Sequence, residues 1–262
     1  MSYQLPAYIH ALHLNNPVID YTWDDLSPDT CFGDDGFAQE IIKKMEPTDL
    51  RAKIALIISI HEWILGRFEG LTTSKLPYEI AEAAWCANID VNYITYYELD
   101  PDEFMGPIEG ALYVSMNALL PVLYVSDNVY DIEDHGHEDP QYYYDSDEWK
   151  ICLKTLIRLV LHILPEPEVF KAWLKSVINR LIENYTQPEL DPFANLFGQD
   201  ENSSVLGDYV PREIFDLAYN YHPDQTVTLL NTFLSQVDKN NPMLIPLAEL
   251  KKQIKKPYVI QK

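Results

Sequence analysis

The stretch TDLRAKIALIISIHEWILGRFEG, residues 48–70, decides the fold of this chain. Its apolar residues recur three and four positions apart, which is the spacing of an α-helix, and they occupy most of the helical circumference. Pro47, Thr48 and Asp49 are typical of a helix start, and Gly70 follows the last apolar position. We therefore expect a central, mostly buried helix. Its apolar run, which His61 and Glu62 interrupt, is too short to span a bilayer.

The helical period recurs along much of the remaining chain. Residues 1–46 are rich in aromatic and acidic residues and are punctuated by proline and glycine, so we expect an irregular segment with one brief strand at 18–23. Residues 186–210 lack a period and are predicted to form a long loop. The fold class is therefore all-α, a single irregular domain over 1–262 with about eight helices. The seven helices expected besides the central one cover residues 77–99, 103–132, 146–164, 166–185, 211–221, 224–237 and 246–256.

The net charge of −22 is concentrated in one part of the chain. Residues 1–149 carry 28 acidic and 6 basic side chains, whereas residues 150–262 carry 13 of each. Such a chain repels nucleic acids and anionic membranes, which are polyanions, so we expect neither as a partner. A basic partner is the favoured kind, although surplus acid also keeps a protein soluble without any partner.

The cysteines and the first residues indicate the compartment. Cys31, Cys86 and Cys152 lie far apart without a CxxC pair, and their number is odd, so we expect reduced and buried thiols. Residues 1–16, MSYQLPAYIHALHLNN, contain neither Lys nor Arg and no continuous apolar segment, so they do not resemble a signal peptide. A cytoplasmic protein is expected.

Residues 76–149 contain no Lys or Arg, but they hold seventeen Asp and Glu and ten of the eighteen Tyr. Tyrosine gives an interface a large rigid contact area with a polar tip, and surrounding carboxylates steer a basic partner. We therefore expect exposed acidic and Tyr-rich segments within this stretch to bind a partner. The predicted partner-binding residues are Glu98, Asp100, Asp102, Glu103, Asp131, Glu133, Asp134, Glu138, Asp139, Tyr142, Tyr143 and Tyr144.

The pair His135 and His137 is the sharpest candidate for chemistry. Alternate residues of an extended segment point the same way, so both imidazoles could bind one metal ion, with Asp134, Glu138 and Asp139 as further ligands. A metal-dependent hydrolase is the alternative function that this pair indicates. No further His lies nearby in sequence, and a hydrated acidic loop is the competing interpretation. We expect no cofactor.

Other patterns typical of catalysis are incomplete. His61 and Glu62 begin like a zinc-protease helix, but position 65 is Leu where the second His would stand. Glu79 and Glu82 have the spacing of helical magnesium ligands, but acidic pairs of this kind are more often a solvated helix face. The chain has no GxSxG, Walker A or GxGxxG motif. An enzymatic activity is therefore the less favoured class.

The acidic and Tyr-rich segments 93–103 and 127–148, within a helical chain, resemble the immunity proteins that bacteria pair with secreted polymorphic toxins. The resemblance lies in composition and helical pattern and involves no family motif. It implies a stoichiometric inhibitor that binds a cognate basic toxin, often a nuclease. A helical adaptor that docks a partner on the loop 186–210 is the other alternative. The sequence leaves the oligomeric state open.

Overall fold

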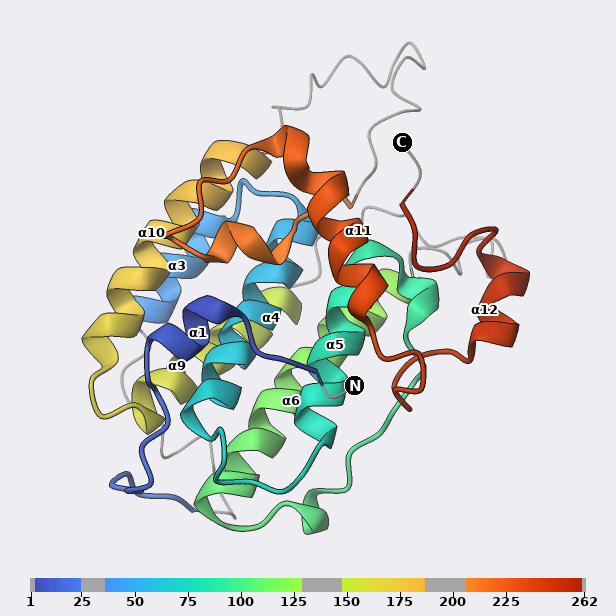
Figure 1. Cartoon of the computed structure of the whole chain (residues 1–262). Coiled ribbons are helices and arrows are strands. Elements are labelled where there is room, and N and C mark those ends of the chain that lie inside the picture. The colour runs from blue at the N-terminus through green and yellow to red at the C-terminus, as the bar shows by residue number, and fades with distance from the viewer. Residues whose placement is uncertain (1–2, 25–35, 129–147, 187–205, 261–262) are drawn as a thin grey trace.

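The computed structural model describes residues 3–24, 36–128, 148–186 and 206–260, without the side chains of 124–128. These residues contain nine α-helices and no β-strand (Figure 1), which confirms the predicted all-α class. Four short 3₁₀ helices are also present: η1 (Val91–Tyr93), η2 (Pro101–Glu103), η4 (Arg212–Phe215) and η5 (Pro223–Gln225). The α-helices are α1 (Ala7–Ala11), α3 (Gly36–Met45), α4 (Leu50–Arg67), α5 (Leu76–Ile89), α6 (Gly106–Asn128), α9 (Glu148–Ile163), α10 (Pro167–Tyr185), α11 (Thr226–Gln236) and α12 (Leu247–Gln253).

Helix α4 is the centre of the fold, as its sequence predicts. Every residue from Ile54 to Phe68 is buried, and the helix packs against α5, α6 and α9 (Figure 1). The Asp49 side chain accepts a hydrogen bond from the backbone N–H of Ala52 at 2.9 Å and so caps the helix. Because α4 is buried on every side from Ile54 to Phe68, other elements pack around its whole circumference.

Four of the five arginines hold irregular segments in place through backbone carbonyl oxygens. Arg67 is fully buried and donates to carbonyls of the N-terminal segment and to Ile163 at the end of α9. Arg51 binds the last carbonyls of α5 and that of Gly207, and Arg180 binds four carbonyls in η4 and the segment after it. The five donors of a guanidinium suit this use. These positive charges are therefore placed inside the fold.

The N-terminal segment is more helical than predicted. It contains α1 and α3, and no strand forms over residues 18–23. The backbone there bonds to side chains instead of to a neighbouring strand, since Arg67 donates to the carbonyls of Asn16 and Val18. The amphipathic period of α3, with Ala38, Ile41 and Met45 buried, is the signal that the sequence reading missed.

The predicted helix 77–99 was ten residues too long, because α5 ends at Ile89 and not at Pro101. Asp90 leaves the helical conformation, and its side chain accepts a hydrogen bond from the Asn92 backbone N–H at 3.0 Å. Aspartate forms such local bonds readily and thereby competes with helix continuation. The residues that follow, including η1 and η2, are consequently a surface segment.

The predicted helix 211–221 is also wrong, because only η4 forms there. Arg180 occupies the carbonyls of Ile214, Asp216, Leu217 and Tyr219, which a continuing helix would use for its own bonds. Elsewhere the agreement is close: α9, α10 and α11 match 146–164, 166–185 and 224–237 to within two residues where described. Helix α6 starts three residues late, and α12 is shorter than 246–256.

Two further expectations concern buried groups and membranes. Cys86 and Cys152 are buried free thiols, as predicted, and burial raises the pKa of Cys152 to about 12. Cys31 lies outside the residues that the structure describes. Within the described ranges, no helix combines the length and the apolar character that crossing a membrane requires.

Candidate functional site

The described part of the predicted partner-binding set lies on the segment 96–105, which we call the acidic ridge. Glu98, Asp100, Asp102 and Glu103 are all exposed. Two large apolar side chains flank them, since Tyr96 is 72% and Met105 59% exposed. Within the described residues, none of the four carboxylates forms an ion pair, in contrast to Glu40, Glu46 and Glu168 elsewhere. The ridge therefore carries uncompensated negative charge beside apolar contact area.

The acidic ridge is fixed to the core although its charged residues face solvent. Leu99 and Phe104 alternate with the exposed acids and are buried, and the ring centroid of Phe104 lies 5.8 Å from that of Tyr113 on α6. The Asp100 side chain accepts from the Asp102 backbone N–H at 3.0 Å, which caps η2. Fixed carboxylates lose less conformational entropy on binding than those of a flexible chain.

The backbone just before the ridge pairs with the chain that precedes α12. Ile94 and Leu244 form an antiparallel bridge, in which Thr95 N–H donates to the Met243 carbonyl at 3.0 Å and Ile245 N–H to the Tyr93 carbonyl at 2.8 Å. The Tyr93 ring is buried, so this tyrosine belongs to the core. The ridge is therefore held at its start by main-chain bonds and in its middle by buried side chains.

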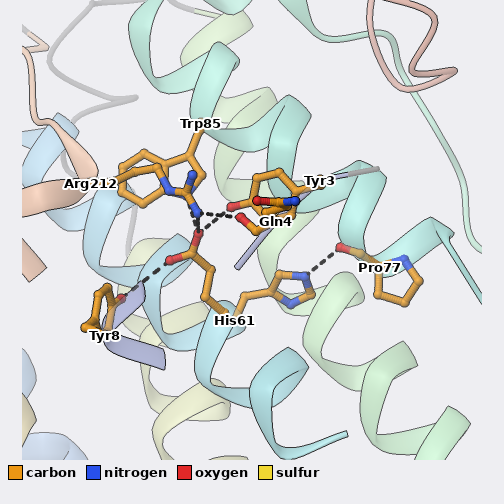
Figure 2. A network of polar contacts seen from close by, with 8 residues as sticks. Tyr3, Gln4, Tyr8, His61, Pro77, Trp85 and Arg212 are labelled. Atoms are coloured by element: carbon orange, nitrogen blue, oxygen red, sulfur yellow. Dashed lines mark hydrogen bonds and ion pairs between the residues drawn. The ribbon is translucent and has the colours of Figure 1, made fainter. Parts of the chain in front are cut away.

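A second cluster of charge is buried and was not predicted as a site. Glu62 of α4, completely inaccessible, lies 2.9 Å from Arg212 Nη2, and its Oε1 also accepts from Trp85 Nε1 at 2.9 Å and from the Tyr3 hydroxyl. Figure 2 shows Tyr3, Tyr8, Trp85 and Arg212 converging from separate parts of the chain. The one sequence signal for this cluster is Glu62 itself, a charged residue within the apolar pattern of residues 48–70.

The Glu62 cluster is built to hold segments together. Its carboxylate is surrounded by donors, and Arg212 also donates to the Gln4 carbonyl at 3.2 Å (Figure 2). Burial is the largest single influence and lowers the pKa of Arg212, but Glu62 together with Tyr3 and Tyr8 raises the pKa overall. The pair attaches the N-terminal segment and η4 to α4, while the buried Nε of Arg212 has no hydrogen-bond partner among the described residues.

His61, next to Glu62, is buried and neutral. Its Nδ1 lies 2.5 Å from Ser115 Oγ and its Nε2 lies 3.1 Å from the Pro77 carbonyl oxygen (Figure 2), so Nε2 carries the proton and Nδ1 accepts. Burial lowers its pKa to about 4. A histidine with both nitrogens bonded inside the core has no lone pair left for a metal ion.

The acidic pair Glu79 and Glu82, considered above as possible magnesium ligands, does not form a metal site with other described residues. Glu82 is 5% exposed and accepts from Asn241 Nδ2 at 2.9 Å and from the Asp238 backbone N–H at 3.1 Å, so the expected solvated face at Glu79 and Glu82 is wrong for Glu82. Over the described ranges, no group of three or more His, Cys, Asp and Glu is arranged to hold a metal ion.

A pocket of about 200 Å³ opens beside Arg212 between the N-terminal segment, η4 and α11. Its lining mixes the carboxyl groups of Glu213 and Asp216 with the Phe233 and Tyr8 rings. The volume is below the roughly 300–1,000 Å³ typical of sites for drug-sized ligands. The pocket thus offers little room for a substrate.

The remaining predicted site residues lie outside the described ranges. They are the acids and tyrosines from Asp131 to Tyr144 and the pair His135 and His137, together with most of the loop 186–210. Their predicted roles stay predictions. The structure thus describes four of the twelve predicted partner-binding residues, the acids of the ridge.

Comparison with known proteins finds no match: no protein-family model, no curated protein and no solved structure is similar to this chain.

Proposed function

We propose that this protein is an acidic immunity protein that binds and neutralises a basic protein toxin, and that the acidic ridge forms part of the interface. The observation that carries the proposal is the exposure of four carboxylates that have no cationic partner in the described part of the chain. Glu98, Asp100, Asp102 and Glu103 are exposed, have no cationic partner within the described residues, and stand on a segment anchored in the core.

The distribution of positive charge supports this proposal. Arg51, Arg67, Arg180 and Arg212 direct their guanidinium groups to carbonyl oxygens or to Glu62, so these arginines do not compensate surface acids. A surface of one sign raises the association rate with an oppositely charged partner and repels polyanions. A basic nuclease is bound at such a surface because the carboxylates replace the phosphates of its substrate.

The apolar residues of the ridge would add the contact area that carboxylates lack. Exposed ion pairs alone contribute little to affinity, because water solvates both partners before binding. Tyrosine and methionine are enriched at interfaces, where they fill pockets of the partner. Tyr96 and Met105 at the two ends of the ridge meet this requirement.

The test is protection against the protein encoded beside this gene, since toxins of the resembled class are encoded next to their immunity proteins. Cells that express this neighbour alone should stop growing, and co-expression of the wild-type chain should restore growth. The ridge variant Glu98→Gln/Asp100→Asn/Asp102→Asn/Glu103→Gln should protect less well, because it lacks the charges that steer and hold the toxin.

The matched control removes the same number of charges elsewhere. Glu166, Glu183, Asp224 and Glu249 are exposed acids on other elements, so replacing all four by the corresponding amides gives the same net charge as the ridge variant. This control should protect like the wild type. Equal protection by both variants would move the interface away from the ridge, and a neighbour that is harmless to cells would remove the immunity function.

A further inference from the structure

Four lysines near the C-terminus form a positive cluster on this otherwise acidic chain. Lys251, Lys252, Lys255 and Lys256 are exposed, and within the described residues none of them has an ion-pair or hydrogen-bond partner. We call them the lysine cluster. Their charge is not used by the fold, in contrast to that of the arginines.

The lysine cluster stands on a fixed part of the structure. Leu250 of α12 is fully buried, and the backbone N–H of Tyr258 donates to the Tyr93 hydroxyl at 2.6 Å. Asn231 of α11 holds the backbone of Ile260, since its Nδ2 donates to the carbonyl oxygen at 3.1 Å and its Oδ1 accepts from the N–H at 2.7 Å. The chain on both sides of the cluster is therefore anchored.

The lysine cluster and the acidic ridge extend in different directions from one junction of the chain. Helix α12 contacts η1, and Ile94 and Leu244 form the bridge between the segments that lead to the ridge and to α12. From η1 the ridge segment runs away from α12 to the start of α6 (Figure 1). Yet none of the four lysines forms an ion pair with a ridge acid in the described chain. Each molecule thus presents two surfaces of opposite charge, each with four charges within six residues, that do not neutralise one another.

We propose that two copies of this chain associate, each placing its lysine cluster on the acidic ridge of the other. In a pair with twofold symmetry the same contact occurs twice, so both charged surfaces of both copies are used. Val259, 53% exposed beside the cluster, and Tyr96 at the ridge supply apolar area at the contact. The pairing of two copies does not depend on the proposed function, whereas its displacement by a toxin rests on that function.

The association is weak, and a basic partner displaces it. The net charge of −22 on each copy opposes approach, but at physiological salt this repulsion is screened beyond about 8 Å, so the surfaces in direct contact decide. A basic toxin needs the same ridge and repels the lysine cluster. The paired form is therefore the state of the protein when it is abundant and its partner is absent.

Sedimentation equilibrium of the full chain, at about 0.15 M salt where the Debye length is about 8 Å, tests the proposal. Two charge-reversal variants are compared with the wild type: Glu98→Lys/Asp102→Lys/Glu103→Lys on the ridge and Lys251→Glu/Lys252→Glu/Lys255→Glu on the cluster. Each variant alone should associate at least about tenfold more weakly, since its two surfaces now carry the same sign. An equimolar mixture of the two should form pairs again, because each surface then meets its opposite.

Several results would overturn the inference. They are a wild type that stays monomeric at the highest concentration reached, a cluster variant that associates as the wild type does, and a mixture that fails to pair while both variants keep the wild-type circular dichroism. The proposed function is tested separately by the cluster variant. It keeps the acidic ridge, so it should still protect cells even though it no longer pairs.

Discussion

The Glu62 cluster and the acidic ridge use charged residues in opposite ways. In the cluster, one fully buried carboxylate meets a guanidinium, an indole N–H and tyrosine hydroxyls that come from three other segments: η4, α5 and the N-terminal segment. On the ridge, four carboxylates stand in solvent without a cation among the described residues. The first arrangement stabilises the fold, whereas the second leaves the fold unaffected and is available to a partner.

This difference predicts how the substitution of a charged residue affects the stability of the protein. A charged side chain with several internal partners is costly to change, because its removal leaves the other groups buried and unsatisfied. A charged side chain with none can be changed with little effect on stability. Variants of the two kinds should therefore differ in the free energy of unfolding before any partner is added.

Arg212→Met should have the largest effect. It leaves the Glu62 carboxylate buried without its cation, and breaking a buried pair in this way costs about 3–5 kcal/mol of the free energy of unfolding. Urea denaturation followed by tryptophan fluorescence measures this loss. Lys251→Met, at an exposed position, is the control and should change stability by no more than about 0.5 kcal/mol. The double variant Glu62→Met/Arg212→Met should be more stable than Arg212→Met alone, and a less stable double variant would contradict a buried ionised pair.

His61 should make the protein less stable in acid. Its pKa is about 4 in the fold against 6.5 for the ordinary group, so only the unfolded chain takes up a proton between these values. Stability from this group is complete above pH 6.5 and falls as the pH is lowered to 4, by about 3 kcal/mol. His61→Gln should remove this part of the pH dependence in urea titrations at several pH values. An unchanged dependence would mean that His61 is not buried and neutral.

Asp49 should act in the opposite direction over nearly the same range. Burial raises its pKa from 3.8 to about 6, so the folded chain takes up a proton first and stability from this group increases as the pH falls from 6 to 3.8. The change is again about 3 kcal/mol at most. Asn also caps helices, so Asp49→Asn should be more stable than the wild type at pH 7 and equal to it near pH 4. A variant that is less stable at both pH values would show that the carboxylate is needed in its charged form.

Gly207→Ala should be the next smaller change, roughly 2–3 kcal/mol. Gly207 has a φ of +81°, and an added Cβ would lie 2.1 Å from Cγ of the buried Asp49. Gly70 has a φ of +77° with nothing within 4 Å, so Gly70→Ala isolates the backbone cost of about 1–2 kcal/mol. The melting temperatures of the two variants should therefore differ. Equal values would mean that the segment with Gly207 does not pack on Asp49.

Neutralising the ridge should have the smallest effect on the fold. The variant Glu98→Gln/Asp100→Asn/Asp102→Asn/Glu103→Gln should unfold within about 0.5 kcal/mol of the wild type, because exposed carboxylates without an ion-pair partner contribute little. Asn at position 100 keeps an oxygen that can cap η2. Thermal unfolding followed by circular dichroism is sufficient. A large loss of stability would show that the carboxylates have internal partners and would end the contrast with Glu62.

The sequence allowed the fold class and the central helix to be predicted because the period of residues 48–70 is strong. The ends of helices were harder to predict where a side-chain hydrogen bond, and not a proline, stops the helix. Asp90 stops α5 through its own local hydrogen bond, and Arg180 prevents a helix after η4 from a distance of more than thirty residues in sequence. Neither effect can be read from periodicity.

The exposed acids of the ridge were predictable because charged residues clustered on both sides of Pro101 rarely enter a core. The Glu62 cluster was not, since Arg212 and Tyr3 are 150 and 59 residues away from Glu62 in sequence. A polar residue within an otherwise apolar helix was the one available signal, and it does not name its partners.

The most direct test of the account is the affinity of the neighbouring gene's product for two variants of equal net charge, measured by calorimetry. One is the ridge variant and the other is the control with amides at Glu166, Glu183, Asp224 and Glu249. If the ridge forms the interface, its variant should bind at least about tenfold more weakly than the wild type, and the control within about threefold, since rim charges affect affinity little. Equal weakening of both would show that only total charge matters and would contradict a localised binding surface.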